Sequence, residues 1–441
     1  NQISQFPLLS RPSQKSIRYR FIILKLLNRK ISRILHMLNL DSTDPVDNPN
    51  GLSTLISSLR ERIFRSVKMD VWQHTLTKSV IDINPISMKL NRHKASEVVE
   101  DRAAYAHNAM FSQAYRQVQA MNPKVLSRKG GGWKVIFLGE SADDYGGPFR
   151  ESLTAICTEL ETNQLDLLIP VPNQKNAIGE NREKFIPNPQ ATTTKHLKWY
   201  TFMGELLGIG LLSKNVLPLD LPSIFWKAVV KEEITIKDLE AIDQMCYQSM
   251  KALREIEEKG ITDQETFSSI IYETFSTKGA DDLEVELFKG GKKQVVTFDT
   301  RNQYADMVEQ YRLNEVKEQI KAIQQGLYSI VTPRFFPIFS WHELEMLLCG
   351  SPDIDLKVLK KHTIYEGYTA NSREVKDFWA IMESFDSKDR SNYLRFVWGR
   401  SRLPITEEGF THHMKIQRLE RPNPDAVLPL SHTCFFSIEL P

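Results

Sequence analysis

An α+β protein with more than one domain is predicted by three features of the sequence. Its 441 residues exceed the roughly 250–300 that one hydrophobic core supports. Segments with apolar residues at helical spacing alternate with short strand-like runs, and the C-terminal part is the richest in such runs. Apolar residues make up 41% and charged residues 25% of the chain, which excludes wholesale disorder.

Composition also narrows the function classes. The formal net charge of +2 is too small to indicate nucleic-acid binding. The four cysteines are widely spaced and form no C-x-x-C pair, which predicts free thiols in a reducing compartment: Cys157, Cys246, Cys349 and Cys434. We find no signal peptide, glycosylation sequon or apolar run near 18 residues, so a cytoplasmic location is expected, with membrane association as an alternative. The chain begins at Asn1 and reads as a piece of something larger.

Residues 1–85 are expected to form a helical extension. The first 40 residues contain eight Lys or Arg and no Asp or Glu, with apolar residues such as Phe21, Leu24, Leu27 and Ile31 at helical spacing. An anionic membrane surface or an acidic partner could bind such a basic amphipathic helix. The favoured interpretation is that its apolar stripe packs on a neighbouring helix of the parent protein.

The periodicity from Ile86 onward predicts mostly helices. Helices are expected over residues 95–121, 150–160, 200–212, 243–256, 302–322, 341–348, 375–385 and 389–397, and strands over 88–92, 133–138, 283–287 and 295–297. Thr235, with Asp238 three residues on, is a helix cap. Gly204, Gly208 and Gly210 lie in an apolar helix, where they permit close packing. No Cys/His cluster or phosphate loop is found, so neither a metal nor a cofactor is expected.

A series of motifs follows one order along the chain. They are D-Y-G-G-P-F-R-E (144–151), G-E-L-L-G-I-G-L-L (204–212) with L-P-L-D-L-P (217–222), I-T-I-K-D-L-E-A-I-D (234–243), Y-R-L-N (311–314), T-I-Y-E-G-Y (363–368), D-F-W (377–379), W-G-R-S-R-L-P (398–404) and L-P-L-S-H-T-C-F (428–435). In order and spacing, the segment from about residue 86 to 441 resembles the catalytic domain of HECT-type E3 ubiquitin ligases. The region around Tyr145–Leu160 is most similar to the very large HECT ligases that also carry propeller repeats.

The resemblance implies a bilobal fold with a large, mainly helical N-lobe and a small α/β C-lobe joined by a flexible hinge. We expect the N-lobe over residues 86–362, with an E2-binding subdomain at about 230–310, and the C-lobe over 369–441. The hinge is expected at 363–368, with Tyr365, Glu366 and Gly367 absorbing the motion.

The resemblance also assigns a chemistry to Cys434. As a thiolate it would take ubiquitin from an E2 as a thioester and pass it to a substrate lysine. His432 would either touch the thiol or order the loop, which is the preferred reading, and Thr433 would support the loop through its hydroxyl or backbone. Arg402 would brace the loop or stabilise an anion. Glu439 would orient the acceptor lysine or be a solvated surface charge.

The resemblance also implies an E2-binding site, which corresponds to one apolar stripe of a helix in this sequence. Cys246, Ser249, Met250, Leu253 and Ile256 share a face, and with Tyr304 they would line a groove for E2 loops. From the sequence alone, without the resemblance, an apolar stripe of this kind more often belongs to the hydrophobic core.

Two further expectations concern the end of the chain and the alternatives. The chain stops at Pro441, without the segment that HECT C-lobes have after the cysteine strand, which would leave Phe435, Phe436 and Ile438 exposed. A cysteine hydrolase of ubiquitin conjugates and a non-catalytic helical scaffold are the competing functions.

Overall fold

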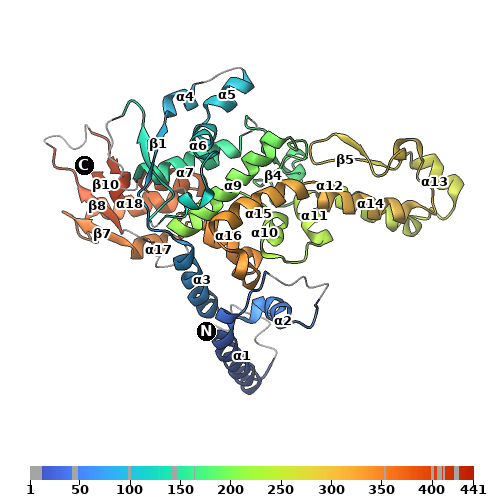
Figure 1. Cartoon of the computed structure of the whole chain (residues 1–441), viewed down its shortest axis with the longest axis horizontal. Helices are drawn as coiled ribbons and strands as arrows, with labels where there is room; N and C mark the ends of the chain where they lie inside the picture. Colours follow the sequence, from blue (N-terminus) through green and yellow to red (C-terminus); the bar gives the residue numbers. More distant parts are fainter. Residues whose placement is uncertain are drawn as a thin grey trace.

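A computed structural model describes most of the chain. It covers residues 12–41, 48–97, 101–128, 130–140, 147–162, 164–351, 354–398, 402–404, 410, 413–421 and 427–441, without the side chains of Arg102, Lys388 and Cys434. Residues 144–146 and 399–401 of the motifs above lie outside this part. Figure 1 shows a large helical body, a small α/β unit at its left and a helical extension below it.

The described part of the extension contains the helices α1 (Gln14–Ile34), α2 (Leu52–Ser58) and α3 (Arg65–Ser79), with 3-10 turns η3 (Leu35–Met37) and η4 (Arg60–Arg62). Trp72 of α3 lies edge-on against Phe336 and Phe339 of the body, with ring centroids 5.3 Å away in both cases. The extension is therefore anchored in the main hydrophobic core.

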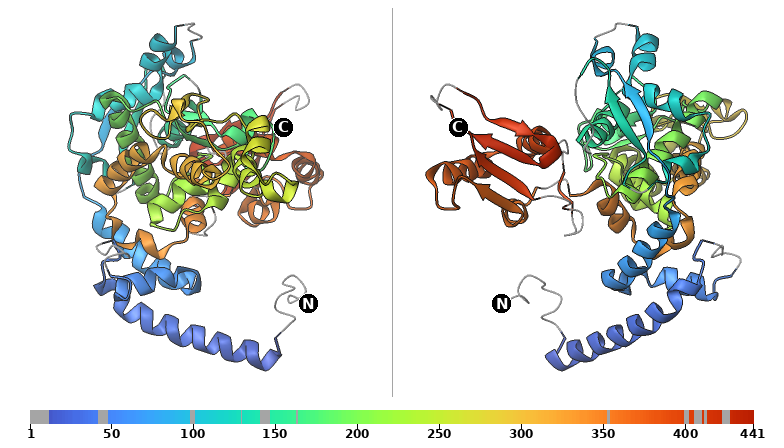
Figure 2. Two further views of the ribbon diagram at one scale, coloured as in Figure 1. Left: turned by 90° about the vertical axis from the view of Figure 1, so that its right-hand side faces the viewer. Right: turned by 60° about the vertical axis from the view of Figure 1, so that its left-hand side comes forward.

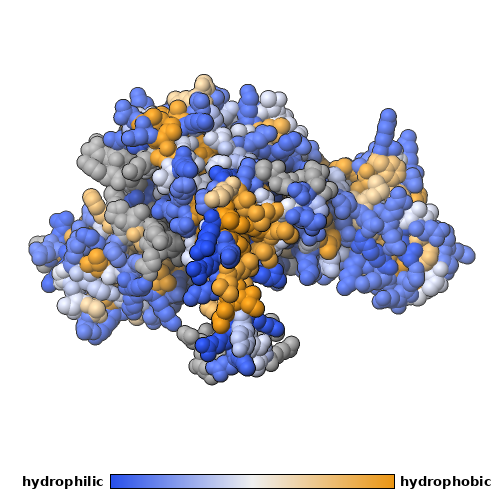
Figure 3. Space-filling model, turned by 60° about the horizontal axis from the view of Figure 1, so that its bottom comes forward, coloured by the Kyte–Doolittle hydropathy of each residue, from blue (hydrophilic) through white to orange (hydrophobic). Residues whose placement is uncertain are grey.

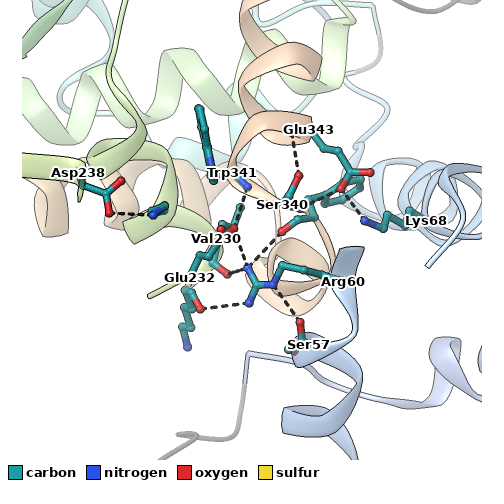
Figure 4. A network of polar contacts seen from close by, with 12 residues as sticks. Ser57, Arg60, Lys68, Val230, Glu232, Asp238, Ser340, Trp341 and Glu343 are labelled. Carbon is teal, nitrogen blue, oxygen red and sulfur yellow. Dashed lines mark hydrogen bonds and ion pairs between the residues drawn. The ribbon is translucent and has the colours of Figure 1, made fainter. Parts of the chain in front are cut away.

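Polar contacts add to this anchorage (Figure 4). The Arg60 guanidinium donates hydrogen bonds to the carbonyl oxygens of Val230 (3.1 Å), Lys231 (3.2 Å) and Phe339 (3.3 Å). Lys68 Nζ lies 2.5 Å from the Glu343 carboxylate. Because these contacts tie η4 and α3 to the body, the extension is held in place.

The large body begins with β1 (Ile86–Leu90) and β2 (Trp133–Phe137), which pair in parallel. Its other elements are α4 (Arg92–Ser96), α5 (Arg102–Asn108), α6 (Met110–Val118), η5 (Pro123–Leu126), α7 (Gly147–Leu160), β3 (Leu168–Pro170), α8 (Pro172–Lys175), β4 (Phe185–Pro187), α9 (Thr194–Ser213), α10 (Ser223–Val230), α15 (Lys317–Ile330), η8 (Pro333–Ile338) and α16 (Trp341–Cys349). β3 and β4 are antiparallel.

The single helix expected over residues 95–121 is wrong. The chain forms α4, α5 and α6 instead, with extended backbone at Ala109 (ψ 141°) between the last two. The buried Glu159 carboxylate accepts hydrogen bonds from the backbone N–H groups of Met110 and Phe111, both at 2.8 Å. These bonds satisfy the free N–H groups of a new helix start, which stabilises the break.

An arm with a small core of its own projects from the body, at the right of Figure 1. It contains α11 (Ile236–Ile242), α12 (Gln244–Arg254), η6 (Ile256–Lys259), α13 (Gln264–Ile270), η7 (Gly291–Lys293), α14 (Arg301–Asn314) and the antiparallel pair β5 (Ser276–Lys278) and β6 (Glu284–Glu286). Thr235 and Asp238 form the predicted capping box at the start of α11.

The small unit has a separate core and a four-stranded sheet of order β7-β8-β10-β9. It contains α17 (Leu356–Lys361), β7 (Thr363–Glu366), α18 (Arg373–Ser384), α19 (Ser387–Trp398), β8 (Met414–Arg418), β9 (Leu430–His432), η11 (Thr433–Phe435) and β10 (Ser437–Leu440). β8 is parallel to both β7 and β10, and β9 is antiparallel to β10. Figure 2 shows this unit as a body distinct from the large one.

The hinge predicted at residues 363–368 is misplaced. Tyr365 and Glu366 belong to β7, paired with Ile416 and Gln417 of β8, and Gly367 turns directly after it. Ile354 and Leu359 already belong to the small core. The connection between the two units therefore begins at Gly350, after α16, and not in the polar segment that the sequence indicated.

Candidate functional site

The turn that carries Cys434 links two antiparallel strands of the small sheet. Its backbone follows β9 into η11 and returns through Phe436, which has a left-handed conformation (φ 49°). The Phe436 ring is buried and stacks on Trp398, with centroids 4.1 Å apart and an interplanar angle of 4°. This stacking fixes the turn on the small core.

Only part of the apolar exposure expected around the cysteine turn is present in the structure. Phe435 is 60% exposed, as predicted, but Phe436 and Ile438 are buried at 0% and 4%. The two buried residues pack among the residues of the small core, including Trp398. Of these three residues, Phe435 is therefore the one that adds exposed apolar surface beside the cysteine.

The large body contacts the turn through Arg150 of α7. Its guanidinium donates a hydrogen bond of 3.2 Å to the carbonyl oxygen of Thr433, the residue before the cysteine. Arg150 is itself only 7% exposed. Arg150 lies in the motif at 144–151, but no role could be predicted for it, because its partner lies 283 residues away in the sequence.

A cavity of about 430 Å³ lies where the two units meet. It is lined by residues of the large body, including Arg92, Glu151 and Glu159, and by Arg395 and Thr433 of the small unit. Arg92 forms ion pairs with Glu140 and Glu151. The positive charge of Arg92 on the cavity wall is therefore compensated by these two glutamates. Because Thr433 is part of the lining, the cavity lies next to the cysteine turn.

Glu159 at this cavity has an altered acidity. Burial raises the pKa of its carboxyl group to about 7, although the hydrogen bonds from Phe111 and Met110 oppose the shift. Both carboxylate oxygens accept backbone N–H groups. Its geometry is that of a structural cap for α6 and not of a free acid or base.

His432 and Glu439 are brought together by strand pairing. Ser437 lies opposite His432 in the ladder, so Glu439 is a diagonal neighbour, and His432 Nε2 lies 3.1 Å from Glu439 Oε1. The two side chains are 47% and 27% exposed. This contact orders the strands on either side of the turn and leaves both groups open to solvent.

Arg402 lies elsewhere. It is buried and forms an ion pair with Asp220 of the large body. Its neighbour Leu403 accepts a hydrogen bond of 3.3 Å from the backbone N–H of Ser351, in the connection between the units. The ion pair with Asp220 connects the two units, so the described contacts of Arg402 correspond to neither of the expected roles, bracing of the cysteine loop or stabilisation of an anion.

The other three thiols are poor nucleophiles. Burial raises the pKa of Cys157 well above its usual value and that of Cys349 to about 12. Burial also raises the pKa of Cys246 to about 11. At neutral pH these groups are almost entirely protonated, and the thiol form neither attacks a carbonyl readily nor binds a metal well.

Most of the residues predicted to line the E2 groove are buried in the structure. Met250, Leu253, Ile256 and Tyr304 are 9%, 6%, 4% and 3% exposed and form the core of the arm. The Tyr304 hydroxyl donates a hydrogen bond of 3.0 Å to the Ser276 carbonyl oxygen. Ser249 is exposed and Cys246 half-buried. The stripe faces inward because α14 covers it.

Other apolar side chains of the arm are open to solvent. Ile270, Tyr272 and Val295 are 53%, 78% and 58% exposed. Thr274 and Val295 form an isolated antiparallel bridge, so Tyr272 projects to the same side as Val295. We name these three residues the arm face. Periodicity missed it, because two of the three residues lie outside regular elements.

No group of three or more His, Cys, Asp or Glu side chains among the residues of the described ranges could hold a metal ion. No helix in the same ranges is long and apolar enough to cross a membrane.

Comparison with known proteins gives consistent matches. Residues 154–441 match the family described as HECT-domain (ubiquitin-transferase). The chain is 32% identical over 455 residues to the E3 ubiquitin-protein ligase HERC2 of Mus musculus, covering 100% of this chain and 9% of that protein. It is 33% identical over 322 residues to the E3 ubiquitin-protein ligase TOM1 of Saccharomyces cerevisiae, covering 70% of this chain and 9% of TOM1. The chain thus spans about a tenth of the length of these relatives.

Proposed function

Since the chain belongs to the HECT family of ubiquitin transferases, we propose that Cys434 accepts ubiquitin from an E2 as a thioester and passes it to a lysine of a substrate protein. One observation supports this choice of thiol above the others. Cys434 lies in a turn between the exposed residues His432 and Phe435, whereas burial raises the pKa of the other three thiols.

The first step is an exchange between two thioesters. The Cys434 thiolate attacks the ubiquitin carbonyl carbon, the new C–S bond forms, and the E2 cysteine leaves as a thiolate. An ordinary cysteine has a pKa of about 8.5, so a few per cent is thiolate at neutral pH. Because reactant and product are both thioesters, this step needs orientation more than driving force.

The second step needs a proton acceptor. A lysine amine attacks the Cys434 thioester, the amide bond forms, the C–S bond breaks with Cys434 leaving as a thiolate, and the proton lost by the amine passes through solvent to that thiolate. Glu439 and His432 are the described ionisable pair nearest the turn in sequence, and both remain partly exposed. We assign Glu439 to orienting the lysine ammonium and His432 to positioning Glu439.

The arm face is the proposed E2 contact. Protein interfaces are dominated by a few exposed aromatic and apolar anchors, and Tyr272 is the most exposed aromatic side chain of the arm. This assignment replaces the buried stripe of α12. The partners are then a ubiquitin-charged E2, ubiquitin and a substrate protein, and free thiols suit a cytoplasmic location.

A charging assay tests the proposal. The protein is incubated with E1, ATP, ubiquitin and a panel of E2 enzymes, and the products are separated with and without a reducing agent. We expect a thiol-sensitive adduct on the chain that Cys434→Ala abolishes and that Cys434→Ser converts into a slowly formed, thiol-resistant ester.

The outcomes separate the competing functions. Cleavage of ubiquitin chains without an adduct would indicate a hydrolase, and neither product would indicate a scaffold. An adduct that survives in Cys434→Ala would overturn the assignment of the thiol.

A further inference from the structure

Helix α1 presents a second apolar stripe, whose side chains are exposed in the described part of the chain. Tyr19, Ile22, Ile23 and Leu26 are 56%, 43%, 64% and 53% exposed. Their spacing of i, i+3, i+4 and i+7 places them on one face of the helix. In Figure 3 apolar and strongly hydrophilic surfaces lie side by side along the projecting extension.

The opposite face of α1 is the one that packs on the protein. Ile31 and the following Leu35 are buried at 4% and 0%. Asn28 donates a hydrogen bond of 2.9 Å to the Arg62 carbonyl oxygen and accepts one of 2.6 Å from the Phe64 N–H. The stripe therefore points away from the body, and the contacts of Arg60 and Lys68 hold the extension that carries it.

Cations surround this stripe. α1 carries seven basic residues and no acidic one, all seven are exposed, and none forms an ion pair with another residue of the described ranges: Lys15, Arg18, Arg20, Lys25, Arg29, Lys30 and Arg33. Lys15, Arg29, Lys30 and Arg33 continue the face of the stripe beyond its two ends. The whole chain has a formal net charge of only +2, so this positive charge is strongly localised.

We propose that α1 binds the surface of an anionic lipid bilayer, lying in the plane of the head groups. Apolar side chains would enter the acyl boundary, while the long cationic side chains reach back to lipid phosphates and carboxylates. Tyr19 suits the interface because its ring is apolar and its hydroxyl polar. Helix α1 lies at an extremity of the molecule, where a flat surface can reach it (Figure 2).

Charge argues against a second copy as the occupant. Two such helices would bring fourteen like charges together, counting the seven of each. Each Lys or Arg near an anionic bilayer instead strengthens binding roughly fivefold. The proposal concerns attachment only and stands independently of the transferase chemistry.

Vesicle sedimentation tests the proposal with the complete chain. The protein is mixed with vesicles of phosphatidylcholine alone or with phosphatidylserine at about 0.15 M salt, near the ionic strength where exposed charges are largely screened beyond roughly 8 Å. We expect it to sediment with the anionic vesicles only. Ile22→Asp/Ile23→Asp should weaken binding at least tenfold, and Arg29→Gln/Lys30→Gln/Arg33→Gln on the order of 100-fold.

Matched variants exclude a general effect of the substitutions. Ile381→Asp/Phe396→Asp changes two exposed apolar residues of the small unit, and Lys317→Gln/Lys321→Gln/Lys357→Gln removes three exposed charges elsewhere. Both should bind vesicles like the wild type, and circular dichroism should show equal helix content in all variants. No sedimentation with anionic vesicles, or equal sedimentation of the α1 variants, would overturn the proposal. Self-association or capture by an acidic protein without vesicle binding would do the same.

Discussion

At the scale of single residues, the hydrogen bond from Arg150 to the Thr433 carbonyl oxygen holds the cysteine turn on the large body. Hydrogen bonds from charged donors contribute about 1.5–3 kcal/mol. We expect Arg150→Ala to slow discharge of ubiquitin from Cys434 to lysine about tenfold, because the turn loses its fixed position. Charging from an E2 should change less, since the thiol is retained.

Single-turnover gels that follow charging and discharge separately check this prediction. Arg150→Lys keeps a cationic donor on α7 and should restore part of the discharge rate. Equal slowing of both steps, or a large fall in Tm, would mean that Arg150 acts on folding and not on positioning.

Glu205 of α9 gives a second prediction at this scale. Burial raises the pKa of its carboxyl group to about 7. Ionisation is therefore disfavoured in the folded state, and the stability present below about pH 4.5 is lost as pH rises through 7. Glu205→Gln should raise stability at pH 8 by up to about 3 kcal/mol and change it little at pH 4.

Thermal unfolding at the two pH values measures this effect. The control is Glu420→Gln, which changes an exposed glutamate and should shift the Tm only slightly at either pH value. A Glu205→Gln variant with the wild-type Tm at pH 8 would contradict the predicted shift.

At the scale of elements, the arm face can be separated from the arm core. Tyr272→Ala and Val295→Asp change exposed side chains, so they should leave folding intact and slow charging by an E2 at least tenfold. Met250→Asp would instead bury a charge and unfold the arm. Charging rates at varied E2 concentration, with Met245→Ala as an exposed control on α12, test the difference.

If both Tyr272→Ala and Val295→Asp were charged at the wild-type rate by every E2 tested, the arm face would not be the E2-binding surface. Loss of helix content in either variant would show instead that the exposed residues support the fold.

Some elements could be predicted from the sequence because their cause is local. The capping box at Thr235 and the strand at 133–137 are examples. The small residues of α9 were also predicted correctly, since a Cβ on Gly204 would lie 1.9 Å from the Ile323 carbonyl oxygen of α15. In each case the local pattern allows few alternatives.

Other features depend on partners that lie far away in sequence. Periodicity showed that one face of α12 is apolar, but not that α14 covers it. The segment at 363–368 has the polar, glycine-bearing composition of a linker, yet Tyr365 pairs with Ile416 in the small sheet. Arg150 lies in the motif at 144–151, but its role could not be predicted, because it is defined by a residue 283 positions away.

At the scale of the whole molecule, the cysteine turn and the arm face lie toward opposite ends of the protein (Figure 1). The turn is held on α7 and the arm projects from the other side of the body. If an E2 docks on the arm face, the small unit must move for Cys434 to reach its thioester. Such a motion has to be absorbed by the few residues that join the units.

Two glycines mark the two possible sites of this motion, and substitutions at them can distinguish between these sites. Gly350 (φ +69°) lies in the connection, where an added Cβ would come 2.7 Å from the Leu403 carbonyl oxygen and 2.9 Å from Val216. Gly367 (φ +77°) has similar backbone strain, but its added Cβ would meet Arg418, inside the small unit. Alanine therefore strains both sites, yet only at Gly350 does the clash involve the packing of one unit against the other.

We accordingly expect Gly350→Ala to disfavour the observed arrangement and to populate more open ones. Its radius of gyration from small-angle scattering should rise, and the ratio of charging to discharge rates should change. Gly367→Ala should lower the Tm of the small unit while leaving both quantities near their wild-type values. If Gly367→Ala produced the larger change in dimensions and in this ratio, the motion would reside after β7, and Gly350 would be a rigid part of the connection.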